Sequence, residues 1–315
     1  MAFTSVQELV AAAEQGSPRA IGRLISMVEN NSPHLREAME LMSPRTGRSH
    51  VVGITGSPGV GKSTTTTALV TALRARGQRV GVLAVDPSSP FSGGAVLGDR
   101  IRMQKHATDP EVFIRSMASR GHLGGLSAAA PQALRVFDTA GFDTVLVETV
   151  GVGQSEVEIA SAADTTLVLS APGMGDSIQA AKAGILEIAD IFVVNKADRD
   201  GAAQLIRELR AMIALATLGP GDWTPPIVRT VAHIEEGIPE LLQQIDAHRE
   251  HGQAGSRWAE RRLKRAAAEV EALVLGTIRH RILERGRDAF GAVAVAVRDG
   301  ELDPYAAADQ ILEQL

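Results

Sequence analysis

The stretch at residues 56–63, with the sequence GSPGVGKS, constrains the fold of this chain more than any other feature. It matches the pattern G-x-x-x-x-G-K-[S/T] at every fixed position, with an apolar run before it and a helix-compatible run at 64–75 after it. In that strand–loop–helix context the pattern predicts a phosphate-binding P-loop rather than a glycine-rich turn. Glycines let the backbone curl closely around a phosphate, so that its N–H groups and the helix N-terminus face the anion.

The side chains of the loop have separate predicted roles. Lys62 is expected to reach the β- and γ-phosphates, and the hydroxyl of Ser63 is expected to ligate Mg²⁺. The remaining contacts would come from the backbone of the loop and the first turn of the helix. The predicted phosphate-binding residues are Gly56, Ser57, Pro58, Gly59, Val60, Gly61, Lys62, Ser63 and Thr64.

Apolar runs alternate with helical stretches from residue 50 to about residue 232. Most of the runs are continuously apolar, which is typical of strands buried on both faces. The pattern therefore predicts an α/β fold with a doubly wound, mostly parallel sheet whose ligands bind at the carboxyl ends of the strands. The predicted strands are 50–55, 79–85, 112–117, 144–148, 165–170, 191–195 and 227–231.

Helical patterns flank the predicted sheet in the sequence. We expect an N-terminal helical extension at 1–46, a P-loop domain at 47–250 and a C-terminal helical arm at 251–315. The extension fits either a packing appendage or a partner-binding element. The pattern predicts a break at 251–255, a long amphipathic helix at 256–285 and a last helix at 304–315.

Asn195, Lys196 and Asp198 belong to the pattern N-K-x-D, which directly follows a predicted strand. A carboxylate at Asp198 can accept hydrogen bonds from guanine N1–H and the exocyclic amine, a pair of donors that adenine lacks. The asparagine can contact the other edge of the base. After a P-loop, this pattern predicts guanine recognition, and backbone groups of Val231 and Ala232 are further candidates for contact with the guanine oxygen.

Three acidic residues are candidates for organising Mg²⁺ and the water that attacks the γ-phosphate. Glu148 follows an apolar run, where it would hold Mg²⁺ directly or through water while the Gly151 N–H senses the γ-phosphate. Asp86 ends a strand that we expect beside the P-loop strand, and Asp99 closes the loop that follows. The alternative role of Asp86 and Asp99 is to cap a helix or a turn.

The expected catalytic residues are Lys62, Asp99 and Glu148. Gln154 lies in a predicted switch segment, and Gln154 and Asp99 are both candidates for positioning the attacking water. Residues 138–141 spell DTAG, the γ-phosphate sensor of Ras-like GTPases, but they precede a strand whereas a sensor follows one. We therefore interpret 138–141 as a helix end and a turn.

Composition excludes several other classes of protein. The chain has no cysteine, so it contains no disulfide and no thiolate metal site. The formal net charge is −5 and the sequence has no long basic run. The chain therefore lacks the positive charge pattern typical of a nucleic-acid-binding protein. No apolar span is long enough to cross a bilayer, and the N-terminal segment does not have the pattern of a signal peptide. We expect a soluble, cytoplasmic protein that binds neither nucleic acid nor membrane.

The motifs GSPGVGKS, DPSSPFSGGAVLGDRIRM, ETVGVGQSE and NKAD, together with the helical appendages, resemble the MeaB/ArgK family. These are SIMIBI-class P-loop GTPases associated with methylmalonyl-CoA mutase. The resemblance implies Mg²⁺-dependent GTP hydrolysis and a chaperone that gates adenosylcobalamin delivery to the mutase and protects it. It also implies a homodimer through the C-terminal arm and a mobile loop at 172–182, in which Lys182 is a candidate for communication with the partner.

Several alternatives stay open. An ATP-dependent kinase of a transport protein is one, although N-K-x-D argues against it. A nickel-inserting GTPase is another, although the chain lacks the His- or Cys-rich site that such a metallochaperone needs. A third is a non-catalytic scaffold gated by nucleotide. Since no water-positioning base is assured, we expect slow basal hydrolysis that a partner accelerates, and a related cobalamin-dependent acyl-CoA mutase is an alternative partner.

Overall fold

The computed structural model describes residues 3–87, 104–106, 108–119, 126–149, 162–173, 188–215, 219, 221–255, 257–285 and 287–313. The chain divides into two compact units, Met1–Arg262 and Leu263–Leu315. The first unit contains the sheet and the P-loop. The second contains most of the C-terminal helical segment.

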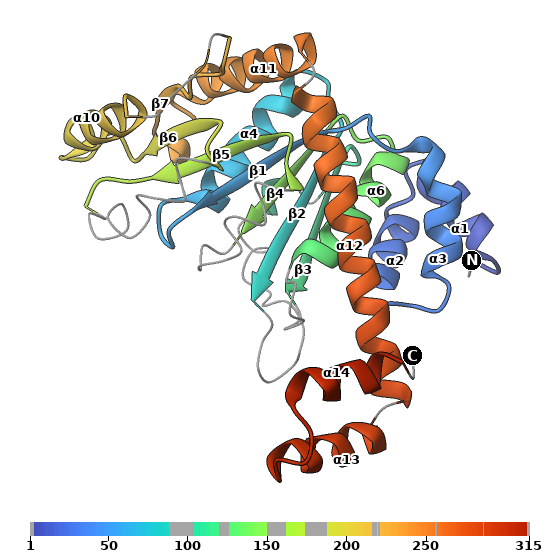
Figure 1. Cartoon of the computed structure of the whole chain (residues 1–315). Coiled ribbons are helices and arrows are strands. Elements are labelled where there is room, and N and C mark those ends of the chain that lie inside the picture. The colour runs from blue at the N-terminus through green and yellow to red at the C-terminus, as the bar shows by residue number, and fades with distance from the viewer. Residues whose placement is uncertain are drawn as a thin grey trace. The chain divides into compact units, whose positions relative to one another are not determined.

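Seven parallel strands form one sheet in the order β3-β2-β4-β1-β5-β6-β7 (Figure 1). This confirms the predicted doubly wound α/β fold, and every strand lies within one or two residues of its predicted position. The strands are β1 (His50–Gly56), β2 (Val80–Pro87), β3 (Val112–Ser119), β4 (Thr144–Thr149), β5 (Thr165–Ser170), β6 (Ile191–Asn195) and β7 (Ile227–Thr230).

The strand that carries Asp86 does not lie beside the P-loop strand, so that prediction was wrong. Strand β4 lies between β1 and β2, and Glu148 pairs with Ile54 on one side and with Ala84 on the other. After β2 the chain runs outward to β3 before it returns as β4. Asp86 is therefore one strand farther from the P-loop than expected, whereas Glu148 is directly adjacent to it.

Helices cover both faces of the sheet, because alternate residues of each buried strand point to opposite faces. One face packs against α1 (Val6–Glu14), α2 (Pro18–Glu29), α3 (Leu35–Met42), α6 (Leu126–Thr139) and α10 (Ala202–Ile213). The other packs against α4 (Lys62–Ala75) and α11 (Ile238–Ala254). Three short 3₁₀ helices are η1 (Ser43–Arg45), η2 (Gln104–His106) and η3 (Ala232–Ile234).

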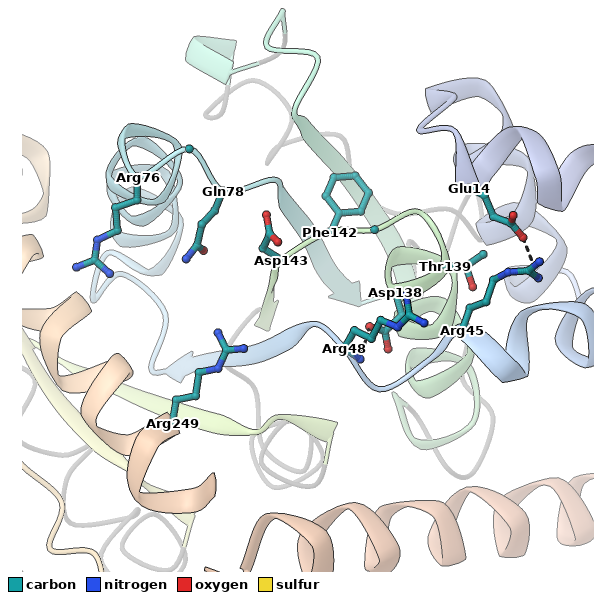
Figure 2. Close-up of a pocket in the computed structure, with 12 residues that line it drawn as sticks. Glu14, Arg45, Arg48, Arg76, Gln78, Asp138, Thr139, Phe142, Asp143 and Arg249 are labelled. Carbon is teal, nitrogen blue, oxygen red and sulfur yellow. Dashed lines mark hydrogen bonds and ion pairs between the residues drawn. The ribbon is translucent and has the colours of Figure 1, made fainter. Parts of the chain in front are cut away.

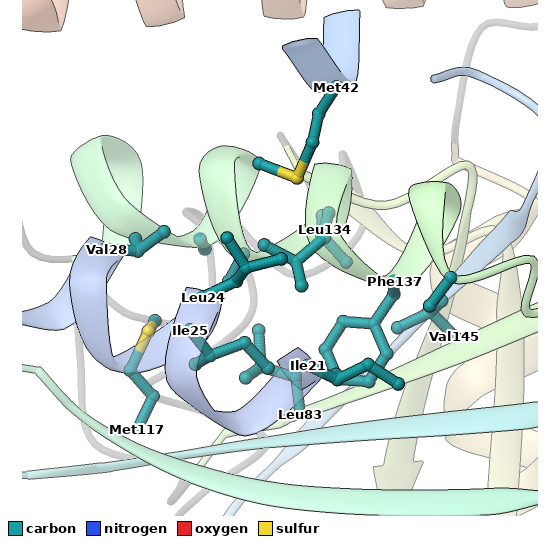
Figure 3. Packing of buried hydrophobic residues seen from close by; sticks show 14 of the residues in the cluster. Ile21, Leu24, Ile25, Val28, Met42, Leu83, Met117, Leu134, Phe137 and Val145 are labelled. Atoms are coloured by element: carbon teal, nitrogen blue, oxygen red, sulfur yellow. The ribbon is translucent and has the colours of Figure 1, made fainter. Parts of the chain in front are cut away.

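The N-terminal helices share their apolar core with the sheet. Ile21, Leu24 and Ile25 of α2 are almost completely buried and face Leu83 of β2 and Phe137 of α6 (Figure 3). Ser17 caps α2 at its N-terminus, where its hydroxyl accepts a hydrogen bond from the Ala20 N–H. The helices at 6–42 therefore form part of the packing of the P-loop domain.

An ion pair also joins these helices to the edge of the sheet. Arg115 of β3 donates to Glu29 of α2 over 2.5 Å and to the hydroxyl of Ser26 over 3.0 Å. The partly buried guanidinium thus fixes α2 against an edge strand. A segment attached only by a linker would not make such a contact with the sheet.

Residues 138–141 form a helix end and a turn, as the sequence predicts. Helix α6 ends at Thr139. The Asp138 carboxylate accepts hydrogen bonds from the backbone N–H groups of Gly47, Arg48 and Ser49, over 2.7, 3.1 and 2.7 Å. Asp138 therefore holds the linker that leads into β1.

The predicted break at 251–255 is not where α11 ends, since the helix continues to Ala254. Gly252 serves close packing instead, because a Cβ there would lie 2.4 Å from the Trp258 ring. The remaining helices are α12 (Arg257–Arg285), α13 (Arg287–Arg298) and α14 (Pro304–Leu312), of which α13 was not predicted. Within the described residues, no helix is long and apolar enough to cross a membrane.

Replacing Leu24 by alanine tests whether the N-terminal helices belong to the domain core. Leu24 is 1% exposed, so we expect Leu24→Ala to lower the free energy of unfolding by about 2–5 kcal/mol in urea denaturation. Leu215→Ala is the control, because Leu215 is 83% exposed and its truncation should change stability by less than about 0.5 kcal/mol. Equal effects of the two substitutions would contradict a shared core.

Candidate nucleotide-binding site

The P-loop turns sharply between the end of β1 and the start of α4. Gly56, Gly59 and Gly61 all have positive φ angles, of 139°, 82° and 99°. A Cβ on Gly56 would lie 2.3 Å from the Leu169 carbonyl oxygen, and one on Gly61 would lie 2.3 Å from Asn195 Nδ2. The neighbouring protein therefore leaves no room for a side chain at Gly56 or Gly61.

The Lys62 side chain folds back over the loop that precedes it. Its Nζ donates hydrogen bonds to the carbonyl oxygens of Gly56, over 2.6 Å, and Ser57, over 3.1 Å. Only 7% of the residue is exposed. The ammonium group thus lies against the backbone of the P-loop, and its contact with a phosphate stays a prediction.

Ser63 and Glu148 meet at the carboxyl ends of β1 and β4. The Ser63 hydroxyl donates to Glu148 Oε1 over 2.6 Å, and Thr66 Oγ1 lies 2.9 Å from Glu148 Oε2. Glu148 is 4% exposed. Sequence reasoning missed Thr66, although its place one helical turn after Ser63 puts both hydroxyls on the same face of α4.

The Ser63–Glu148 pair fits the predicted Mg²⁺ ion. A hydroxyl and a carboxylate are the hard oxygen ligands that Mg²⁺ takes, and the ion commonly keeps waters and phosphate oxygens as its other ligands. Such a site needs few protein carboxylates. Among the described residues, no group of three or more His, Cys, Asp or Glu side chains is arranged to hold a metal ion.

Several predicted residues fall where the structure gives no description. Asp99, Gly151, Gln154 and Lys182 lie outside the described residues. For Asp86 the backbone alone is described, at the end of β2 where it pairs with Ala118 of β3. The roles of these residues in the switch and the metal site stay predictions.

Asn195 forms hydrogen bonds both with the P-loop and with the end of β7. Its Nδ2 donates to the Val60 carbonyl over 2.8 Å. Its Oδ1 accepts from the Ala232 N–H over 3.1 Å and from the Thr230 hydroxyl over 3.2 Å. We expected Asn195 to contact the base and a backbone group of Ala232 or Val231 to contact the guanine oxygen. In the structure, Asn195 accepts a hydrogen bond from the Ala232 N–H and is 3% exposed, and the contacts with a base stay predictions.

Lys196 and Asp198 are the other two fixed residues of the N-K-x-D pattern. Lys196 adopts a left-handed conformation with a φ of 56°, and its Nζ donates to the Gly59 carbonyl over 2.6 Å. Asp198 is exposed, and its carboxylate has no partner among the described residues. The Asp198 carboxylate can therefore accept hydrogen bonds from a ligand, and its contact with guanine stays a prediction.

A protein-family model described as methylmalonyl-CoA mutase-associated GTPase MeaB matches residues 21–287. The chain belongs to this family. The resemblance drawn from the sequence motifs is thereby confirmed, and the P-loop is that of a GTPase family.

Individual relatives of this MeaB-family chain agree with the assignment. A protein of Pyrococcus abyssi named as a GTPase is 47% identical over 318 residues, covering 98% of this chain and 97% of the relative. The methylmalonic aciduria type A homolog of Caenorhabditis elegans is 35% identical over 259 residues, covering 76% and 65%. A crystal structure titled LAO/AO transport system kinase superposes with a TM-score of 0.74 at 26% identity, covering 99% and 98%.

Substituting Gly61 tests whether the Asn195 contact shapes the P-loop of this GTPase. Gly61→Ala would force a side chain into a left-handed position and against Asn195, at a cost of about 1–3 kcal/mol for the backbone alone. We expect at least about tenfold weaker binding of a fluorescent GTP analogue.

The matched control for Gly61→Ala is Gly77→Ala. Gly77 has a similar φ of 78°, but a Cβ there would meet no atom within 4 Å. The control should therefore carry comparable backbone strain and keep its GTP affinity. Equal GTP affinities in the two variants would contradict the role of the Asn195 contact.

Proposed function

We propose that this MeaB-family GTPase hydrolyses GTP with Mg²⁺ and uses the cycle to control a cobalamin-dependent mutase. The contact between Ser63 and Glu148 carries the proposal for hydrolysis. It joins the P-loop hydroxyl to a buried carboxylate on the adjacent strand, at the carboxyl edge where ligands of parallel sheets bind.

The proposed reaction is in-line attack of water on the γ-phosphate, with GDP as the leaving group. Lys62 and the N–H groups of residues 56–64 would stabilise the charge that develops on the phosphate oxygens. Ser63 and Glu148 would hold Mg²⁺, with Asp86 and Asp99 as further candidates. The bound ion would neutralise charge on the β- and γ-phosphates.

We further propose that hydrolysis by the isolated protein is slow and that a partner accelerates it. Asp99 and Gln154 are the candidates for orienting the water, and a partner could supply a missing arginine. Gly151 and Gln154 would form one switch segment, and Lys182 would belong to a second segment that reports to the partner.

The proposed partner is methylmalonyl-CoA mutase or a related cobalamin-dependent acyl-CoA mutase. The description of the matching family names this mutase, and the Caenorhabditis elegans relative is named for methylmalonic aciduria. The chain would act in the cytoplasm as a chaperone that gates adenosylcobalamin loading and protects the mutase.

We also propose that the protein is a homodimer formed through α12. The helix exposes Leu263, Val270 and Val274, at 71%, 60% and 50%. Their spacings of seven and four residues place these apolar side chains on one stripe. A monomeric mass in solution would contradict the dimer.

Asp198→Asn tests the choice of GTP over ATP. The amide would present a donor where guanine N1–H and the exocyclic amine need an acceptor, so GTP affinity should fall about 10- to 100-fold. Xanthosine triphosphate, which carries an oxygen in place of that amine, should bind the variant better than GTP does.

Asp200→Asn is the control for Asp198→Asn, because Asp200 is also exposed and lies two residues farther along the same turn. Its nucleotide preference should be unchanged in the same competition titration. A preference of the wild-type protein for ATP over GTP would defeat the proposal and favour a transport-system kinase.

Phosphate release in the presence of the purified mutase tests the proposed cycle. We expect slow release by the protein alone and faster release with the mutase. Glu148→Gln should lower the stimulated rate about 10- to 100-fold, because it weakens the site for Mg²⁺.

Glu208→Gln is the control for Glu148→Gln, since Glu208 is an exposed residue of α10 that contacts Gln204. It should behave as wild type. Absence of phosphate release even with the mutase would favour a non-catalytic, nucleotide-gated scaffold. If release by the protein alone is as fast as with the mutase, the partner does not accelerate it.

A further inference from the structure

A cavity of about 590 Å³ opens at the end of the sheet opposite the P-loop. Its lining residues Arg48, Gln78 and Asp143 lie just before β1, β2 and β4, at the amino ends of these parallel strands. The P-loop lies at their carboxyl ends. The cavity is therefore a separate site, and no part of the proposed hydrolysis uses it.

Positive side chains reach this cavity from three separate parts of the first unit (Figure 2). Arg45 and Arg48 come from the segment that leads into β1, Arg76 from the end of α4 and Arg249 from α11. Positive groups that share a cavity repel one another, and a bound anion would relieve that repulsion.

The carboxylates of the cavity are already engaged by other groups. Glu14 pairs with Arg45 over 2.9 Å. Asp138 accepts the three backbone N–H groups of the linker, and Asp143 accepts the Arg79 N–H over 2.7 Å. These acids therefore use much of their acceptor capacity on the protein backbone and on Arg45.

Arg48 and Arg249 have no carboxylate of their own. Within the described residues neither guanidinium makes a hydrogen bond or an ion pair. Burial lowers the pKa of the nearby His50 to about 4, and the positive charge of Arg249 also acts on His50, where it lowers the pKa in the same direction. Arg76 has an acidic partner, Asp246, but that pair is solvent-exposed and so contributes little.

A buried hydroxyl beside the cavity also lacks a partner. Thr139 is 6% exposed, and its Oγ1 makes no hydrogen bond within the described residues. Buried hydroxyls normally have a partner, either protein, water or ligand. This observation is independent of the arginines and concerns the same cavity.

We propose that this cavity binds a small phosphate-bearing ligand between Arg48 and Arg249. Guanidinium groups bind phosphate oxygens through paired hydrogen bonds, and a phosphate offers more acceptors than a carboxylate for several arginines at once. The volume is that of a site for a small molecule. The amide of Gln78 lines the same cavity and would contact a polar part of the ligand.

Pyrophosphate titration of the GDP-bound protein tests the proposal. With Mg²⁺ and saturating GDP the P-loop is filled, so calorimetry should detect one further pyrophosphate site. Arg48→Ala and Arg249→Ala should each weaken that site about tenfold or more. Arg36→Ala is the control, because its side chain is 92% exposed on α3, and it should bind as wild type does.

Two further variants separate this site from the P-loop and from a folding defect. Lys62→Ala should lose GDP affinity and still bind pyrophosphate at the second site, with the same dependence on Arg48. Arg48→Lys keeps the charge without the paired donors and should bind with intermediate affinity and an unchanged unfolding midpoint. No pyrophosphate binding to the GDP-bound protein would overturn the proposal, and so would Arg48→Ala and Arg249→Ala variants that bind pyrophosphate as tightly as the wild-type protein does.

Discussion

One buried amide holds the nucleotide site together. Asn195 at the end of β6 bonds to the Val60 carbonyl in the P-loop and to the Ala232 N–H after β7. It thereby fixes the distance between the loop expected to bind phosphate and the residues expected to read the base. The same side chain lies so close to Gly61 that no Cβ fits there. The N-K-x-D pattern and the second fixed glycine of the P-loop thus depend on one contact.

Strand order decides which acidic side chain lies close enough to contact the P-loop. Because β4 lies between β1 and β2, Glu148 reaches Ser63, whereas Asp86 starts one strand farther away. Asp138, whose DTAG sequence resembles a γ-phosphate sensor, binds the linker before β1 at the opposite end of the sheet. Similar acidic residues therefore have different roles, because the sheet places them at different ends.

The amino end of the sheet contains a second set of buried polar contacts. Thr165 Oγ1 lies 2.8 Å from both His50 Nε2 and His248 Nδ1, and His248 Nε2 lies 3.2 Å from Asp190 Oδ1. Arg261 forms two hydrogen bonds with the same Asp190 carboxylate, over 2.9 and 3.1 Å. These bonds tie α11 and the start of α12 to β1, β5 and the residue that precedes β6. They satisfy groups that would otherwise be buried without partners.

The sequence by itself determined the seven strands, the P-loop, the N-K-x-D pattern and the family. Each is visible in a short stretch of sequence, because it depends on the hydrophobicity or the backbone conformation of consecutive residues. Only the tertiary structure decided that Thr66 joins Ser63 at Glu148, that Asn195 bonds to Val60 and Ala232, and that Arg48 and Arg249 line one cavity. Each of these arrangements brings together segments that are far apart in the sequence. Which segments come together depends on strand order and helix packing, which no local sequence pattern contains.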